Sequence, residues 1–390
     1  METKNVIYKN FDNKADKLIQ KKLNKFLNLK NLISKYPLLK SLKSDYRYSY
    51  KKKFLNILNK NIEFNIIGMG GSILGTQSIY DFLKHKINKN FFFFDNLKSY
   101  KNLNTKKKRL NIIISKSGNT LETFSNLNLI LTHQKNNNNL IITEKKKSIL
   151  NDLANKLKID VIEHKNYIGG RYSVLSEVGM LPAELMGLKE KKFKKLNDLV
   201  KKKMFTNFLI KNVISIYKNI QKGKRNSVIL NYDESSDNFL KWYQQLSAES
   251  LGKNNKGIFP IISTMPKDNH SLLQLYLDGP KNNFYTFFSV KNKNSFKYNN
   301  TFLVDGFKNL KNKNDQEVLY AQKNATENVF RKKKIPFRSF DIRHRKEDTL
   351  GELFTFFILE TLLLSNLLRV NPLNQPSVEL IKIETKKILN

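Results

Sequence analysis

The sequence lacks cysteine, and it lacks any uninterrupted apolar run long enough to cross a membrane. Without cysteine there is no disulfide, no thiolate metal site and no cysteine nucleophile, so a reducing cytoplasm is compatible with the chain. A membrane span needs about 18 apolar residues, and the polar N-terminus has no apolar segment typical of export signals. We therefore expect a cytoplasmic protein with no membrane partner.

Acidic residues are also scarce, because 33 Asp and Glu stand against 71 Lys and Arg, giving a formal net charge of +38. This charge alone suggests a nucleic acid or an anionic membrane surface as partner. The excess is spread along the chain as Lys mixed with Asn and Ile, whereas specific nucleic-acid binding relies on Arg and stacked aromatics in one patch. We expect a solvated surface and no specific nucleic acid, with a nucleic-acid-binding protein as the weaker alternative.

Two sets of short apolar runs alternate with longer amphipathic stretches, a pattern typical of parallel sheets flanked by helices. We expect strands at 64–67, 91–94, 111–114, 140–143 and 160–162, and again at 227–232, 258–262, 284–290 and 337–342. The apolar segment 349–368 is interrupted by polar residues, which favours a buried helix over a membrane span.

The sequence therefore predicts an α/β fold made of two related halves. We expect an N-terminal helical segment (1–60), a first domain (61–188), a Lys-rich helical arm (189–226), a second domain (227–370) and a C-terminal helical tail (371–390). In such sheets ligands bind at the carboxyl ends of the strands.

Two loops that follow predicted strands have the residues of a phosphate site. The run Ile112–Ile114 leads into Ser115-Lys116-Ser117-Gly118-Asn119-Thr120, just before a helical pattern whose N-terminus would favour an anion. The run at 66–67 leads into Gly68-Met69-Gly70-Gly71-Ser72. These glycines could also form a plain tight turn or a dinucleotide site with Asp95, but two such loops at neighbouring strand ends favour a small phosphorylated metabolite.

Three further side chains could carry proton-transfer chemistry. Arg171, after two glycines, can hold a fixed cation against a developing oxyanion, or can form a structural salt bridge. Glu249, in an otherwise apolar helical pattern, can be a general base, or a surface carboxylate. His270, before another helical pattern, can shuttle a proton near neutral pH, or can simply start the helix.

Taken in order from residue 66 to 382, these motifs resemble those of the glucose-6-phosphate isomerase (phosphoglucose isomerase) family of the compact bacterial type. The shared patterns are the GMGGS, SKSGNT, GGRYS and AESLGK segments, the histidine before QL, and a variant of the family's C-terminal NPFDQPGVE signature, here NPLNQPSVE. The resemblance implies two sugar-isomerase (SIS) domains and a reversible interconversion of glucose 6-phosphate and fructose 6-phosphate through a cis-enediolate. It also implies that no metal or organic cofactor is needed.

The resemblance also implies roles for single residues. Glu249 resembles the base that moves a proton between carbons 1 and 2, and Arg171 resembles the cation that stabilises the enediolate. His270 resembles the ring-opening histidine that the adjacent subunit supplies, which implies a homodimer with shared active sites, and Lys382 resembles the lysine that assists ring opening. The phosphate and sugar contacts would be Ser72, Ser115, Lys116, Ser117, Thr120, Gln245 and Gln375.

Two alternatives stay open at this point. Sugar-isomerase domains also occur in regulators that bind a sugar phosphate without reacting, although such a module has no use for a base, a cation and a proton shuttle together. The same proton transfer also serves other hexose phosphates, such as mannose 6-phosphate.

Overall fold

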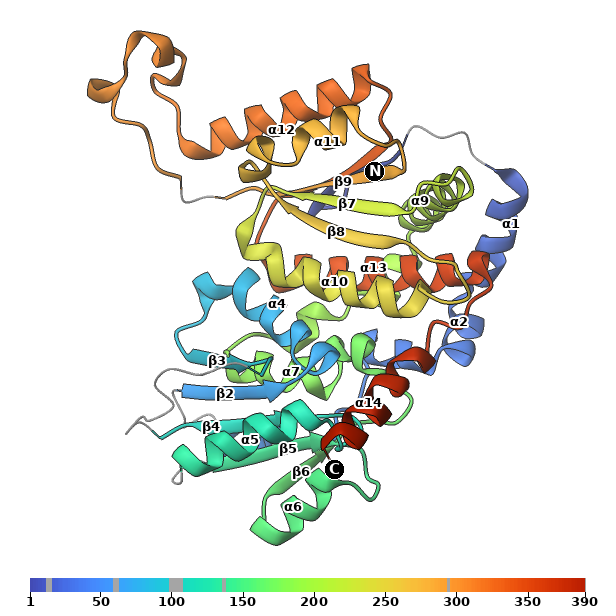
Figure 1. The fold of residues 1–390 in the computed structure, drawn as a ribbon, viewed down its shortest axis with the longest axis vertical. Helices are drawn as coiled ribbons and strands as arrows, with labels where there is room; N and C mark the ends of the chain where they lie inside the picture. Colours follow the sequence, from blue (N-terminus) through green and yellow to red (C-terminus); the bar gives the residue numbers. More distant parts are fainter. Residues whose placement is uncertain (12–15, 59–62, 98–107, 135–137, 293–294, 390) are drawn as a thin grey trace.

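A computed structural model describes residues 1–11, 16–58, 63–97, 108–134, 138–292 and 295–389, so the expected boundary at residue 60 lies outside the described part. It contains two five-stranded sheets, one above the other in Figure 1, with helices between them and on both outer faces. The mixed α/β architecture expected from the sequence is confirmed.

The first sheet is wholly parallel, in the order β3-β2-β4-β5-β6. Helices α5 and α6 cover its outer face, where Ile67, Ile113 and Ile141 join residues of these helices in a small apolar core. The bounds are β2 (Glu63–Gly68), α4 (Leu74–Phe82), β3 (Asn90–Phe94), β4 (Leu110–Ile114), α5 (Leu121–His133), β5 (Asn138–Thr143), α6 (Ile149–Leu157), β6 (Asp160–Glu163) and α7 (Glu177–Leu185).

The second sheet has the order β1-β10-β9-β7-β8 and is parallel except for β1. Its outer face packs against α11 and α12 around Tyr285 and Phe330. The bounds are β1 (Val6–Lys9), β7 (Asn226–Asn231), α10 (Asp237–Leu251), β8 (Phe259–Thr264), α11 (Leu273–Asp278), β9 (Asn283–Val290), α12 (Asp315–Lys332), β10 (Phe337–Ile342) and α13 (Glu347–Leu368).

All nine strands expected from the apolar runs are present within a few residues of their predicted ends. The segment expected to be helical, residues 1–60, also contains a strand, because Val6–Lys9 pairs antiparallel with β10. The rest of this segment does contain α1 (Lys17–Phe26), α2 (Leu29–Lys35) and α3 (Lys52–Leu58).

The largest core lies between the sheets, where α10 and α13 from the second half face α4 and α7 from the first. Among the described residues, α13 is the one helix apolar and long enough to cross a membrane, and 94% of its 18-residue apolar window is buried in the protein. Its interior carboxylates have partners: Tyr8 donates to Glu352 at 2.8 Å, and Tyr243 donates to Glu360 at 2.9 Å. The expected buried helix is thus confirmed.

The Lys-rich arm is more than a link between the halves. It contains α8 (Leu196–Val200) and α9 (Lys203–Gln221), and α9 packs against α13 with buried side chains such as Leu209 and Val213. Most of its lysines, such as Lys203 and Lys211, are exposed, but Lys194 is buried and donates to the carbonyl oxygens of Ser41 and Leu175.

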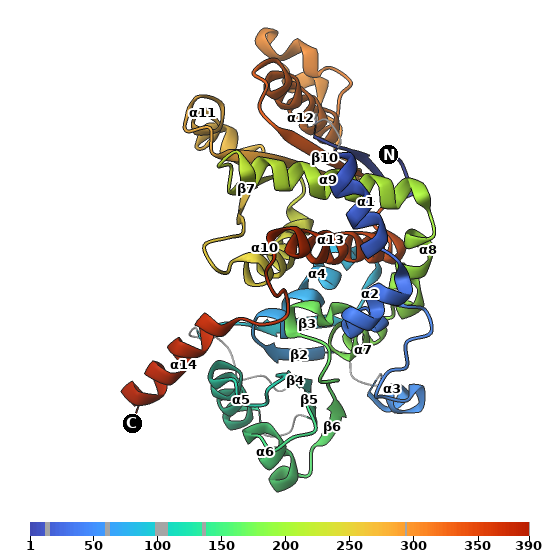
Figure 2. The ribbon, with the colours of Figure 1, turned by 90° about the vertical axis from the view of Figure 1, so that its right-hand side faces the viewer.

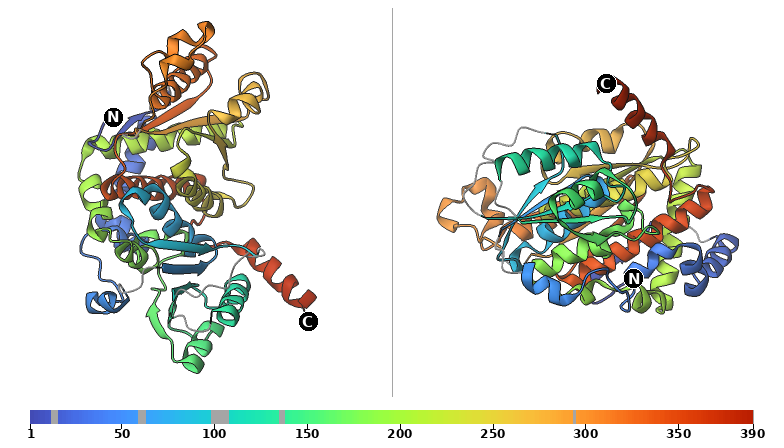
Figure 3. Two further views of the ribbon diagram at one scale, coloured as in Figure 1. Left: turned by 90° about the vertical axis from the view of Figure 1, so that its left-hand side faces the viewer. Right: turned by 90° about the horizontal axis from the view of Figure 1, so that it is seen from below.

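The C-terminal helix α14 (Pro376–Leu389) leaves the body of the protein. Figures 2 and 3 show it projecting beyond the ends of the strands of the first sheet. None of its side chains is buried, although Leu380, Ile381 and Ile388 are apolar. The expected tail helix is present, with its apolar side chains uncovered in the single chain.

Candidate active site

Arg171 lies in the turn η4 (Gly170–Leu175), and its side chain is 2% exposed. Its Nε donates to Ser250 Oγ at 2.9 Å, and its Nη2 donates to the carbonyl oxygens of Pro372 at 2.6 Å and Asn374 at 3.3 Å. These acceptors come from α10 and from the segment after α13. The planar guanidinium, which comes from the first half, is therefore held in one orientation by groups from the second half and the segment that follows it.

The remaining nitrogen of this guanidinium, Nη1, faces two candidate residues. It donates to Glu249 Oε2 at 3.0 Å and to Gln375 Oε1 at 2.5 Å. The other oxygen of Glu249 accepts a hydrogen bond from Gln245 Nε2 at 2.9 Å, one helical turn earlier on α10. Glu249 keeps 30% of its side chain exposed, so a carboxylate open to solvent sits beside a buried cation.

The glycine loop after β2 touches the Arg171 turn directly. A Cβ on Gly71 would lie 2.2 Å from the carbonyl carbon of Gly170, so only glycine fits here. Gly70 has a φ of +52°, and a Cβ on it would lie 2.7 Å from Gln245 Nε2. This close packing brings Ser72, in the turn η2 (Gly70–Ser72), to the same end of α10 as Glu249.

The serine loop after β4 lies beside the glycine loop, because β2 and β4 are parallel neighbours with Gly68 opposite Ile114. Within it, the hydroxyls of Ser115 and Thr120 are 2.9 Å apart, and the backbone N–H of Gly118 donates to Ser115 Oγ at 3.2 Å. Gly118 has a φ of +70°, which favours glycine. Thr120 directly precedes α5, so the free N–H groups of the first helical turn point into this loop.

The side chains of Lys116 and Ser117, in the same loop, have different hydrogen-bond partners. Lys116 Nζ donates to the carbonyl oxygen of Asn166 at 2.8 Å and lies 3.5 Å from Glu144. Burial lowers the pKa of Lys116, and the Glu144 carboxylate opposes that change. Ser117 Oγ accepts from the backbone N–H of Asn119 at 3.2 Å. The lysine keeps a cation beside the anion site.

His270 and Lys382 are not brought to Arg171 within one chain. His270 ends the turn η7 (Lys267–His270) after β8, where it is exposed. Lys382 lies on the projecting helix α14 and pairs with Glu379 at 2.7 Å. The other nine predicted site residues lie on the two loops, the Arg171 turn, α10 and the segment before α14.

Three residues of this region were not predicted as site residues. Tyr172 and Ser250 share a hydrogen bond of 2.8 Å behind the guanidinium, and both are buried. Lys253 donates to the carbonyl oxygens of Ser250 and Asn371, and partial burial, with repulsion from Arg171, lowers its pKa to about 8. Only their position in the sequence could have pointed to them, because each lies within four residues of Arg171 or Glu249.

Comparisons with known proteins identify the family of this chain. The family model described as phosphoglucose isomerase matches residues 52–266. The chain is 34% identical to a glucose-6-phosphate isomerase of Methanocaldococcus jannaschii over 348 residues, which cover 83% of this chain and 82% of that protein.

Solved structures share the fold. A hypothetical protein from Thermus thermophilus superposes with a TM-score of 0.80 at 22% identity, covering 96% of this chain and 95% of that one. A glucose-6-phosphate isomerase from Chlamydia trachomatis superposes with a TM-score of 0.71 at 18% identity, covering 86% and 71%. With a family model over more than half of its length and a relative above 30% identity, the chain belongs to the phosphoglucose isomerase family.

Proposed function

We propose that this protein interconverts glucose 6-phosphate and fructose 6-phosphate, as an aldose-ketose isomerase of central sugar metabolism in the cytoplasm. The observation that carries the proposal is the Arg171–Glu249 pair, with a 3.0 Å contact between a fixed buried cation and a solvent-accessible carboxylate. Isomerisation moves a proton between two adjacent carbons, so it needs a base for that proton and a cation for the charge left on oxygen.

Glu249 is the group we assign as the base. In the open-chain aldose it would take the proton from carbon 2, giving a cis-enediolate, and would return the proton to carbon 1 to give the ketose. Gln245 holds one carboxylate oxygen through a 2.9 Å hydrogen bond. The carboxylate is thereby oriented on α10 before substrate arrives, which reduces the reorganisation needed in the transition state.

Arg171 is the group we assign to the enediolate oxygen. Its Nε and Nη2 are occupied by Ser250 and by backbone carbonyls, so Nη1 is the edge that faces the reaction. Gln375 accepts from the same nitrogen, and we assign it to the sugar hydroxyls. A donor aimed at developing charge typically contributes about 10²–10³ in rate.

The phosphate would occupy the loop 115–120, with Ser72 beside it. Hydroxyls of Ser115, Ser117 and Thr120, free N–H groups at the start of α5 and the cation of Lys116 surround this position. Because Ser72 packs next to Arg171 through Gly71, a hexose anchored by its phosphate would extend toward Glu249.

A homodimer would supply His270 to the site. His270 is exposed at the end of the turn η7, as expected of a side chain offered to a neighbouring subunit for ring opening. Lys382 and the uncovered apolar side chains of α14 would likewise need another surface, either a second subunit or this chain's own site. We propose no metal or organic cofactor, since the assigned residues supply the base, the cation and the anion site.

A coupled assay tests the proposal: purified protein is given fructose 6-phosphate, and formation of glucose 6-phosphate is followed. We expect turnover by the native chain and a loss of about 10²–10⁴ in kcat for Glu249→Gln. Glu163→Gln is the matched control, because Glu163 is also partly exposed and ion-paired but lies on β6 outside the site. Absence of turnover by the native chain, or equal turnover by Glu249→Gln, would contradict the assignment.

A further inference from the structure

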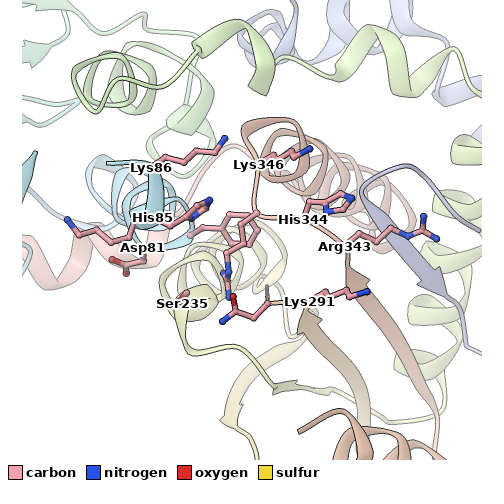
Figure 4. Close-up of a pocket in the computed structure, with 12 residues that line it drawn as sticks. Asp81, His85, Lys86, Ser235, Lys291, Arg343, His344 and Lys346 are labelled. Carbon is pink, nitrogen blue, oxygen red and sulfur yellow. The ribbon is translucent and has the colours of Figure 1, made fainter. Parts of the chain in front are cut away.

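A cavity of about 490 Å³ lies at the junction of the two halves and away from the residues assigned to catalysis. One side comes from the end of α4 and the turn η3 (Lys84–Lys86), and the others come from the loops after β7, β9 and β10. Figure 4 shows His85 and Lys86 facing Lys346 and His344 across it. Its volume is that of a site for a small molecule.

The lining of this cavity is strongly basic. Six of its twelve lining residues are Lys or Arg, two are His, and Asp81 is the one acidic member. Among the described residues, Lys84, Lys291 and Lys346 form no ion pair, whereas Lys86 is paired with Glu347 at 2.6 Å. Cations gathered around one hollow repel each other, and a bound anion would relieve that repulsion.

The general surplus of lysine in this chain does not explain the cluster. The sequence has nine arginines and five histidines in 390 residues. Two of these arginines, Arg343 and Arg345, and two of these histidines, His85 and His344, line this one cavity. Arginine binds phosphate oxygens through two parallel N–H groups, which makes it the residue type enriched at phosphate sites.

The side chain of Arg345 has a buried hydrogen-bond donor without an acceptor among the described residues. Its Nη2 is ion-paired with Asp233, and its guanidinium lies over the ring of Phe82 at 5.3 Å. Its Nη1 is buried and has no acceptor among the described residues. Buried N–H groups are nearly always hydrogen-bonded. Because this donor belongs to a residue that lines the cavity, an oxygen of a bound ligand could accept its hydrogen bond.

The position in the sheet is also that of a ligand site. After β7 the chain adds β8 on one side of that strand, and then β9 and β10 on the other side. Lys291 and Arg343 directly follow β9 and β10, and Ser235 follows β7. The cavity thus lies at the carboxyl ends of parallel strands, where the strand order reverses, which is where open α/β sheets bind ligands.

We propose that this cavity is a second anion site, which binds a small molecule carrying at least two phosphate groups. It is separate from the isomerase site, because the two lie at opposite ends of the same pair of packed helices. Helix α4 runs from the Ser72 loop to Phe82, and α10 runs from Ser236 at the cavity end to Glu249 and Leu251. The hydroxyl of Ser78 donates to the carbonyl oxygen of Asn238 at 2.9 Å between these helices.

Titration calorimetry with inorganic pyrophosphate tests the proposal, in low salt and with saturating fructose 6-phosphate to occupy the isomerase site. We expect one pyrophosphate per chain for the native protein, with affinity that falls as salt rises. Lys291→Ala/Lys346→Ala should bind at least tenfold more weakly. Lys156→Ala/Lys332→Ala removes two exposed lysines elsewhere and should bind like the native chain.

Arg345→Gln serves as a second variant, because it removes the buried donor with a smaller change in surface charge. It should also lose at least tenfold in affinity, with circular dichroism confirming that it is folded. No binding by the native chain, complete competition by fructose 6-phosphate, or equal binding by all variants would overturn the proposal. Isomerase activity is assayed separately, so a failure of the proposed catalytic function would not be mistaken for a failure here.

Discussion

Gly71→Ala should separate the glycine loop from the Arg171 turn. The new Cβ would lie 2.2 Å from the carbonyl carbon of Gly170 and 2.4 Å from the backbone nitrogen of Arg171, whereas ordinary contact begins at 3.4 Å. To restore ordinary contact, the two backbones would have to part by about 1.2 Å, the difference between 3.4 Å and 2.2 Å. A misplacement of about 1 Å at an active site costs about 10²-fold in rate.

The expected result is therefore a fall of about 10² in kcat/KM for fructose 6-phosphate in the coupled assay, measured well below the melting temperature. Gly169→Ala is the matched control, because its Cβ would meet only Tyr172 at the ordinary distance of 3.4 Å, and its φ is −69°. We expect it to retain near-native activity. A fully active Gly71→Ala variant would refute the inference that this contact positions Ser72 against Arg171.

Two further predictions concern the phosphate loop and a histidine behind it. Ser115→Ala/Thr120→Ala removes two hydroxyls that are 2.9 Å apart and should raise KM and also lower kcat, because phosphate binding energy positions the reacting carbons. Burial, with repulsion from Lys116, lowers the pKa of His164 from 6.5 to about 4. Between pH about 6.5 and about 4, His164 is protonated in the unfolded chain but remains neutral in the folded chain. The free energy of unfolding therefore decreases as the pH falls through this range. The loss is about 3 kcal/mol, at about 1.4 kcal/mol per pH unit.

Each of these two predictions has a result that would contradict it. Unchanged kcat/KM in Ser115→Ala/Thr120→Ala would place the phosphate elsewhere. Urea unfolding of His164→Gln and the native chain at pH 7 and pH 4.5 tests the second: the variant should lose less stability on acidification. Parallel losses in both proteins would show that His164 is not the titrating group.

Local pattern predicted most of the strands because each buried strand is a short apolar run. The run Ile112–Ile114, for example, is buried on both faces of a parallel sheet and carries no polar interruption. β1 could not be found this way, because Val6–Lys9 is short, alternates buried and exposed residues, and gains its pairing from Ile342 and its neighbours, more than 300 residues away. Its stability comes from a contact that local sequence does not encode.

The candidate site also contains residues that local sequence predicts and groups that it does not. Glu249 and Arg171 can be predicted as site residues from their own segments, and the structure brings their side chains into contact. The carbonyl oxygens of Pro372 and Asn374 that hold Arg171 could not be identified, since any residue type can offer a backbone carbonyl. The basic cavity could not be predicted from the sequence either. Its lining comes from four separate stretches of chain, and its Lys and Arg residues are only a few of the 71 in the sequence.

The most direct test of the central claim is proton exchange at the reacting carbons. Fructose 6-phosphate is incubated with the protein in deuterium oxide, and deuterium at carbon 1 of the ketose and carbon 2 of the aldose is followed by NMR. The account predicts deuterium at both positions with the native chain and its loss by about 10²–10⁴ in rate with Glu249→Gln. Undiminished exchange and isomerisation by Glu249→Gln would contradict Glu249 as the base that moves this proton through an enediolate.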